Sequence, residues 1–285
     1  MIAAAPVTVP FTVFDNRILV QTTIDGVPGF TMILDTGAHG VGVTPETARA
    51  LHVRVIAAGT IAGAGAQRAR VGQTGLTDVS IGPRDLGKQS ALVVDLSTIR
   101  RAFGFPHLDG IVGYDALRAS YVQIDSDKRL MTVSDSAIIA PPAAHHTPFS
   151  VRDGLLHVAA SVDGFTGDFI LDTGDRSSLT LFSRFAQRNG FYNISQATRN
   201  IVTGYGIGGP IHSNVFASHL SAFGYDLPNV RTRVPVGNAG VFSSSTDSGS
   251  IGNGVLLRFT TLYDRVHGDI AVWQNGPTHV FRAER

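Results

Sequence analysis

The tripeptide Asp-Thr-Gly occurs twice in this chain, each time directly after Ile-Leu, within residues 33–37 and 170–174. The two aspartates, Asp35 and Asp172, are 137 residues apart, and the sequence around them repeats at spacings of 137 to 139. The matching flanks pair residues 11–26 with 149–164 and residues 109–125 with 248–264. A spacing that drifts so little along a whole copy indicates two copies of one structural unit.

Each copy has the pattern of β-strands joined by tight turns. In the first copy, residues 17–24 alternate roughly between inward and outward positions, and residues 30–34 form a buried strand ending at Asp35. Other predicted elements are hairpins at 120–133 and 260–273, and short helices at 45–51 (after the N-cap Thr44) and 181–189. We therefore predict an all-β fold with few short helices, built from two homologous lobes related by pseudo-twofold symmetry.

The boundary between the copies is predicted within residues 134–147, which contain IIAPPAAHHT and show no periodicity. We place the N-terminal lobe at residues 1–140 and the C-terminal lobe at 141–285. His145 and His146 are interpreted as linker residues, since no third ligand follows at the spacing of a metal site. No metal site is therefore predicted.

Composition excludes several classes of function. The formal net charge is only +1, so the chain lacks the strong positive charge that would indicate binding to nucleic acid or to a membrane surface. No apolar run is long enough to span a bilayer. The chain has no cysteine, which excludes disulfides, cysteine-ligated zinc and thiol nucleophiles. The motifs of serine hydrolases, zinc proteases and P-loop enzymes are also absent from the sequence.

The repeated motif suits a pair of catalytic carboxyl groups. The strand fixes each aspartate on a rigid element, and the glycine allows a sharp turn with a close backbone approach. Thr36 and Thr173 can offer hydroxyl and amide groups to the opposite copy. If a twofold axis relates the copies, Asp35 and Asp172 face each other, and two carboxyl groups about 3 Å apart share one proton. Such a pair can activate a water molecule as general base and acid, without metal or cofactor.

These segments resemble the two-lobed aspartic peptidases, pepsin-like and retropepsin-like, over nearly the whole chain; their catalytic dyad is the standard example of a shared proton. ILDTGA and ILDTGD are similar to the two active-site motifs, and residues 108–117 and 249–259 to the later apolar-apolar-Gly motif of each lobe. The short lobes look most like retropepsin subunits fused in one chain, as in small single-chain bacterial relatives. The resemblance implies the acid-protease fold and an endopeptidase acting on peptide or protein substrates. A monomer would suffice for activity, because both half-sites lie in one chain.

The resemblance also implies a β-hairpin flap over the cleft. The first candidate is residues 60–71, with Ala62, Gly63, Ala64 and Gly65 near its tip; the second is 202–213, with Tyr205 and Gly206. Pepsins have one flap and retropepsin dimers two, and the sequence leaves both arrangements open. Residues 204–209 also fit the dinucleotide motif G-x-G-x-x-G, but Pro210 and the residues after it do not begin a helix, so we reject that interpretation.

Some residues of the predicted site depart from the family pattern. Supporting roles are implied for the motif residues Thr36, Gly37, Ala38, Thr173, Gly174 and Asp175. Pepsins usually carry Ser or Thr at the position of Ala38 and Asp175. Asp175 would bring a third carboxyl group near the pair, raising its pKa values, unless it turns away or pairs with Arg176. Asn253 and Gly254 stand where pepsins often have Asp and a bulky apolar residue. The alternative function is a peptide-binding protein of this fold with weak or no catalysis.

Cellular location and specificity are less constrained. The opening MIAAAPVTVP lacks the basic and long apolar regions of a signal peptide and is consistent with the first residues after a removed leader. A periplasmic or secreted location is favoured, and a cytoplasmic one stays open. Dense Ile, Val and Phe near the motifs predict an apolar substrate preference.

Overall fold

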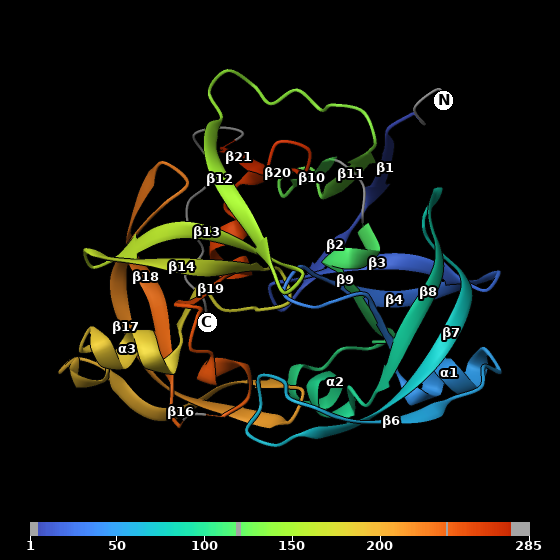
Figure 1. Cartoon of the computed structure of the whole chain (residues 1–285), viewed down its shortest axis with the longest axis horizontal. Coiled ribbons are helices and arrows are strands. Elements are labelled where there is room, and N and C mark those ends of the chain that lie inside the picture. Colours follow the sequence, from blue (N-terminus) through green and yellow to red (C-terminus); the bar gives the residue numbers. More distant parts are fainter. Residues whose placement is uncertain (1–4, 118–120, 238, 275–285) are drawn as a thin grey trace.

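The computed structural model describes residues 5–117, 121–237 and 239–274. Strands dominate, and they form two lobes side by side below a sheet to which both contribute (Figure 1). This confirms the predicted all-β fold of two lobes with few short helices. The lobe boundary placed between residues 140 and 141 stays a prediction.

The first lobe contains a sheet in the order β2-β3-β4-β9-β5-β8-β7-β6. Two pairings in it are parallel, β4 with β9 and β5 with β8, and the other neighbours are antiparallel. The strands are β2 (Thr12–Phe14), β3 (Arg17–Ile24), β4 (Val27–Asp35), β5 (Val41–Val43), β6 (Ile56–Ile61), β7 (Ala69–Ile81), β8 (Arg84–Val94) and β9 (Gly110–Gly113).

The second lobe repeats this arrangement in the order β13-β14-β19-β15-β18-β17-β16. Its parallel pairings, β14 with β19 and β15 with β18, correspond to those of the first lobe. The strands are β13 (Leu155–Val162), β14 (Phe165–Asp172), β15 (Leu179–Leu181), β16 (Thr198–Gly206), β17 (Gly209–Ala222), β18 (Tyr225–Pro235) and β19 (Gly249–Gly252). The structural repeat therefore follows the sequence repeat.

Strands from both halves join in the order β1-β11-β10-β20-β21-β12, seen at the top of Figure 1. The two predicted hairpins meet at its centre, where β10 pairs antiparallel with β20. The strands are β1 (Val7–Pro10), β10 (Tyr121–Asp125), β11 (Leu130–Ser134), β12 (His145–Arg152), β20 (Thr260–Asp264) and β21 (Asp269–Trp273). Of the predicted hairpin 120–133, Ser120 lies outside the described residues.

One sequence interpretation was wrong. His145 and His146 are not linker residues, because they open β12 and pair with Val272 and Ala271 of β21. His146 also contacts Asp269, with Nδ1 2.6 Å from Oδ2. Proline and the lack of periodicity disguised a strand that bridges β21 and β13 and has no buried side chain, so that its sequence needs no alternation.

The helices are short and lie beside the sheets. Thr44 caps α1 by accepting a hydrogen bond from the Thr47 amide at 3.2 Å, as the sequence predicted, and α3 begins at Ser183 rather than Leu181. The helices are α1 (Pro45–Ala50), α2 (Ser97–Phe103), α3 (Ser183–Arg188) and α4 (Asn253–Leu256), with 3-10 turns η1 (Tyr114–Leu117), η2 (Phe191–Asn193) and η3 (Gly240–Ser243). No helix of the described residues is long and apolar enough to cross a membrane.

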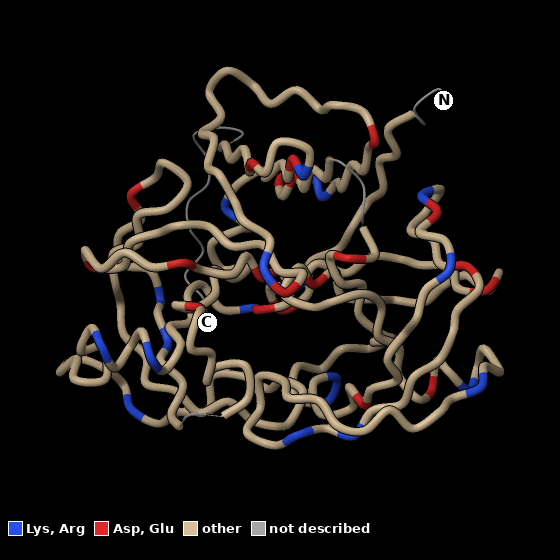
Figure 2. Tube along the Cα trace, viewed as in Figure 1, with Lys and Arg blue, Asp and Glu red and all other residues tan. Residues whose placement is uncertain are grey.

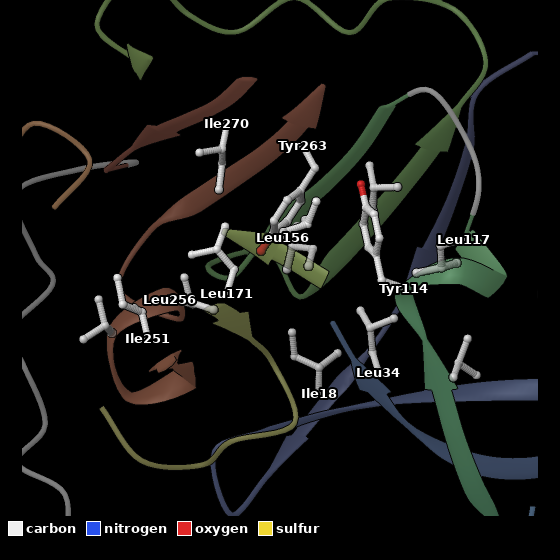
Figure 3. Packing of buried hydrophobic residues seen from close by; sticks show 14 of the residues in the cluster. Ile18, Leu34, Tyr114, Leu117, Leu156, Leu171, Ile251, Leu256, Tyr263 and Ile270 are labelled. Atoms are coloured by element: carbon white, nitrogen blue, oxygen red, sulfur yellow. The ribbon is translucent and has the colours of Figure 1, made fainter. Parts of the chain in front are cut away.

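One apolar cluster runs through both lobes and under the shared sheet (Figure 3). It joins Ile18 and Leu34 of the first copy to Leu156 and Leu171 of the second, and all four side chains are buried. Burying a side chain of this size stabilises the fold by about 1.5–3 kcal/mol. The shared core therefore holds the two lobes, and the strand ends between them, in a fixed relation.

Candidate active site

Asp35 and Asp172 occupy equivalent places, at the ends of β4 and β14. Asp35 pairs with Gly113 of β9, and Asp172 pairs with Gly252 of β19. A side chain at either glycine would collide with backbone of the adjoining motif loop, at Ala38 or Asp175. The Gly-ending segments predicted from sequence therefore let β9 and β19 pass close behind the two loops.

The two carboxyl groups meet between the lobes and share a hydrogen bond. Each loop also supports its own aspartate: the Gly37 amide donates to Asp35 Oδ1 at 2.9 Å, and the Gly174 amide donates to Asp172 Oδ1 at 3.0 Å. A Cβ atom on Gly37 would collide with the Asp172 carboxyl group, and one on Gly174 with that of Asp35. Only glycine therefore permits this approach.

Behind the carboxyl groups, Thr36 and Thr173 form four hydrogen bonds across the pseudo-twofold axis, two of them with each other. The Thr36 amide donates to Thr173 Oγ1 at 2.9 Å, and the Thr173 amide donates to Thr36 Oγ1 at 3.0 Å. Each hydroxyl donates onward to a carbonyl of the other lobe, Thr36 to Leu171 and Thr173 to Leu34, both at 2.7 Å. These buried bonds fix the distance between the loops.

The surroundings raise the pKa values of both aspartates. Burial is the largest cause for Asp172, and the charges of Asp35 and Asp175 add to it, so the pKa of Asp172 lies well above its ordinary range. Burial also raises the pKa of Asp35, but hydrogen bonds from Asp172 and Gly37 and the charge of Arg17 oppose it. The two carboxyl groups together therefore retain one proton at a pH where separate carboxyl groups would have released both.

Asp175 pairs with Arg233, 58 residues away, and not with its neighbour Arg176. Burial alone would raise the pKa of Asp175, but the Arg233 guanidinium and hydrogen bonds from Ser177 and Thr180 outweigh it and lower the pKa. Arg176 instead contacts Asp15 of the other lobe at 2.7 Å. Several of the acidic residues in Figure 2 lie where the two lobes meet.

Sequence reasoning missed two arginines of this region, Arg233 and Arg17. The Arg17 Nε donates to the Gly174 carbonyl at 3.2 Å, so the first lobe braces the second motif loop. The repeat contains a signal that could have identified Arg17. The equivalent residue of the second copy is Leu155, and a charged residue is unusual at the start of a strand that is otherwise apolar.

A cavity of about 470 Å³ lies between the lobes and is lined by Asp35 and Asp172. Of the predicted supporting residues, Gly37, Ala38, Gly174 and Asp175 also line it, while Thr36 and Thr173 lie buried behind. Of the predicted flap residues, the cavity is lined by Ala62, Gly63, Ala64, Tyr205 and Gly206, whereas Gly65 contacts the opposite hairpin. Asn253 donates from Nδ2 to the Thr173 carbonyl at 2.6 Å, behind the cavity.

Both glycine-rich hairpins, β6–β7 and β16–β17, reach over the cavity, and their tips are hydrogen-bonded to each other (Figure 1, bottom). The Gly65 amide donates to the Ile207 carbonyl at 2.8 Å, and the Gln67 amide donates to the Gly208 carbonyl at 3.0 Å. The second-lobe turn η3 joins them, because Val241 donates to the Gly63 carbonyl at 3.1 Å. The arrangement left open by the sequence is therefore one with two hairpins. Throughout the described ranges, no group of three or more potential metal ligands occurs.

The raised pKa of Asp172 predicts a pH dependence of stability. The folded protein keeps a proton that the unfolded chain releases near the ordinary value of 3.8, so this contribution is full below that pH and is lost as pH rises through the folded pKa. Asp172→Asn has no such proton to lose. We therefore expect its free energy of unfolding, relative to that of the wild type, to increase as pH rises. Urea unfolding of both proteins between about pH 4 and pH 7 measures the difference. If the free energies of unfolding of the two proteins changed in parallel with pH, the folded wild type would not be keeping this proton.

Comparison with known proteins gives a family match over part of the chain and a similar fold over nearly all of it. Residues 20–116 match the family described as aspartyl protease (Asp_protease_2). The whole structure is similar to the crystal structure of an aspartic proteinase from Irpex lacteus, with a TM-score of 0.59 and 13% identity. The similarity covers 98% of this chain and 100% of that one. No curated protein matches significantly.

Proposed function

We propose that this chain is an aspartic endopeptidase, because residues 20–116 match the aspartyl protease family and the whole structure is similar to an aspartic proteinase. The observation that carries the proposal is the meeting of Asp35 and Asp172, from equivalent loops of two lobes, in one cavity. A buried carboxyl pair with raised pKa values at the floor of a cleft is typical of a catalytic acid and base.

The larger rise in the pKa of Asp172 supports the following division of roles between the two aspartates. Asp172 retains the proton and donates a hydrogen bond to the carbonyl oxygen of the scissile amide. The Asp35 carboxylate, whose pKa is raised less, accepts a proton from a water molecule between the two groups as that water attacks the carbonyl carbon. The tetrahedral species collapses when a proton passes from the pair to the amide nitrogen, and the C–N bond breaks. Thr36 and Thr173 hold the two loops at the spacing that this exchange requires.

The hairpins suit an extended peptide as substrate. Their tips meet over the cavity, so a bound chain would be enclosed and shielded from bulk water. Ala62, Gly63 and Ala64 of the first flap, with Tyr205 and Gly206 of the second, would contact the substrate backbone. The tips must separate for entry, and the contact between them consists of a few backbone hydrogen bonds next to glycines.

The test is hydrolysis of a broad peptide mixture between about pH 3 and pH 7, with fragments identified by mass spectrometry. We expect internal cleavage that a statine-type inhibitor suppresses, since such compounds place a hydroxyl group between the two carboxyl groups. Binding of peptides without any cleavage across this range would contradict the proposal and favour a peptide-binding protein of the same fold.

A further inference from the structure

The two halves of the cleft differ at four equivalent positions around the motif loops. Strand register and distance from the motif make these pairs equivalent, first-lobe residue first: Ala38 and Asp175, Gly42 and Thr180, Leu92 and Arg233, Ile111 and Ser250. All eight residues line the cavity except Thr180, which is fully buried beneath it. No first-lobe member has a side chain able to form a hydrogen bond, and every second-lobe member has one.

The second-lobe residues form one connected polar cluster. Arg233 Nη2 donates to both carboxylate oxygens of Asp175 at 3.0 Å, and Arg233 Nε donates to Thr180 Oγ1 at 2.7 Å. Thr180 Oγ1 donates to Asp175 Oδ2 at 2.9 Å, and Ser250 Oγ lies 3.3 Å from the same oxygen. Since the Asp175 amide also donates to Asp172 Oδ1 at 2.9 Å, the cluster borders the catalytic pair.

One donor of the cluster is unused. Arg233 is 4% exposed, and Nη1 has no hydrogen-bond partner among the described residues. It points towards Gly204 of the second flap strand, where a Cβ atom would lie 3.5 Å from it, and Gly204 lines the same cavity. A buried guanidinium held in place by Asp175 and Thr180 thus offers a free N–H group to whatever occupies the cleft.

We propose that this second-lobe cluster is a substrate subsite for a neutral hydrogen-bond-accepting side chain, of which glutamine and asparagine are the natural cases. The proposal rests on the proposed peptidase function and names one substrate residue next to the scissile bond. The equivalent first-lobe surface, with Leu92 and Ile111, takes an apolar side chain on the other side of that bond.

The charge balance favours a carboxamide over a carboxylate. The Arg233 charge is already compensated by Asp175, and a substrate carboxylate would lie near both Asp175 and the catalytic pair. An apolar side chain would leave Nη1 buried without a partner when the cleft is filled. A neutral carbonyl oxygen satisfies Nη1 without adding charge.

Two peptide series test the assignment, each varied at only one of the two residues flanking the cleaved bond. At one flanking position, peptides with Gln are expected to be cleaved with a kcat/KM about tenfold or more higher than peptides with Met, and peptides with Asn likewise compared with Leu. At about pH 6, where glutamate is ionised, Gln should also exceed Glu there. The other position should favour the apolar residue.

The double variant Asp175→Ala with Arg233→Leu gives the second lobe the first-lobe residues at two of the four positions, the two that carry charge. It is expected to lose the preference for Gln at that one position and to keep the apolar preference at the other. Arg49→Leu makes the same arginine change on exposed α1 and should keep both preferences.

The possible outcomes distinguish a failure of the proposed subsite from a failure of the proposed peptidase function. If wild-type protein cuts the peptides but no flanking position favours Gln over Met, or if Glu is preferred over Gln, the subsite is wrong. A preference that survives in a folded double variant also overturns it. Should the double variant fail to fold, the wild-type ranking alone decides. If the wild-type protein cuts no peptide at all, the peptidase function itself has failed.

Discussion

Asparagine in place of Asp172 is expected to lower kcat/KM for peptide hydrolysis by at least about 10³-fold, and Asp35→Asn by a similar factor. The amide keeps the size of the carboxyl group and can donate a hydrogen bond, but it can neither release nor accept the shared proton. Because the proposed mechanism uses both carboxyl groups in the same proton transfer, neither residue can replace the other. Initial rates on one cleaved peptide, measured across the active pH range, give the ratio.

A matched control separates chemistry from folding. Asp226→Asn removes a carboxyl group from a side chain that is 76% exposed in the same lobe, and its kcat/KM should stay within about twofold of wild type. Circular dichroism and thermal melting establish that each variant is folded. A folded Asp35→Asn or Asp172→Asn protein that cleaves at the wild-type rate would show that the pair is not the catalytic acid and base.

The sequence predicted those parts of the fold that repeat. Equivalent apolar strands ending in Asp-Thr-Gly, followed by equivalent Gly-ending segments, leave few arrangements other than two matching lobes. The capped helix after Thr44 was also predictable, since the Ncap hydroxyl and Pro45 act locally. In each case the determining contacts lie within one copy or follow from its symmetry.

What the sequence could not predict depends on contacts between distant and non-equivalent residues. Asp175 was expected to pair with adjacent Arg176 or to turn away, but the parallel pairing of β15 with β18 brings Arg233 beside it. Nothing local to Asp175 indicates this partner. The contact between Gly65 and Ile207 similarly depends on how far two hairpins reach across the cavity. A sequence repeat predicts the features that the two copies share. The pair of Asp175 with Arg233 is a difference between the copies, and the hairpin contact is an interaction between them, so the repeat predicts neither.

Removing the hydroxyl of Thr36 or of Thr173 tests whether the hydrogen bonds between the two motif loops are symmetric. We expect Thr36→Val to lower the free energy of unfolding by about 2–6 kcal/mol, because the buried Thr173 amide and Leu171 carbonyl each lose a partner, at about 1–3 kcal/mol apiece. Thr173→Val removes the two mirror-image bonds, to the Thr36 amide and the Leu34 carbonyl. The two losses should therefore be nearly equal. Urea unfolding measures both.

The exposed pair Thr8 and Thr132, whose hydroxyls lie 2.9 Å apart in the shared sheet, provides the control. Thr8→Val removes the same atom from a solvated site, where water replaces the lost bond, and should change stability by no more than about 0.5 kcal/mol. If Thr36→Val and Thr173→Val cost no more than this control, the hydroxyl exchange does not hold the lobes together. If only one of them is costly, the two loops are not bound by symmetric bonds, and the spacing of Asp35 and Asp172 must be set mainly by the core that the two lobes share.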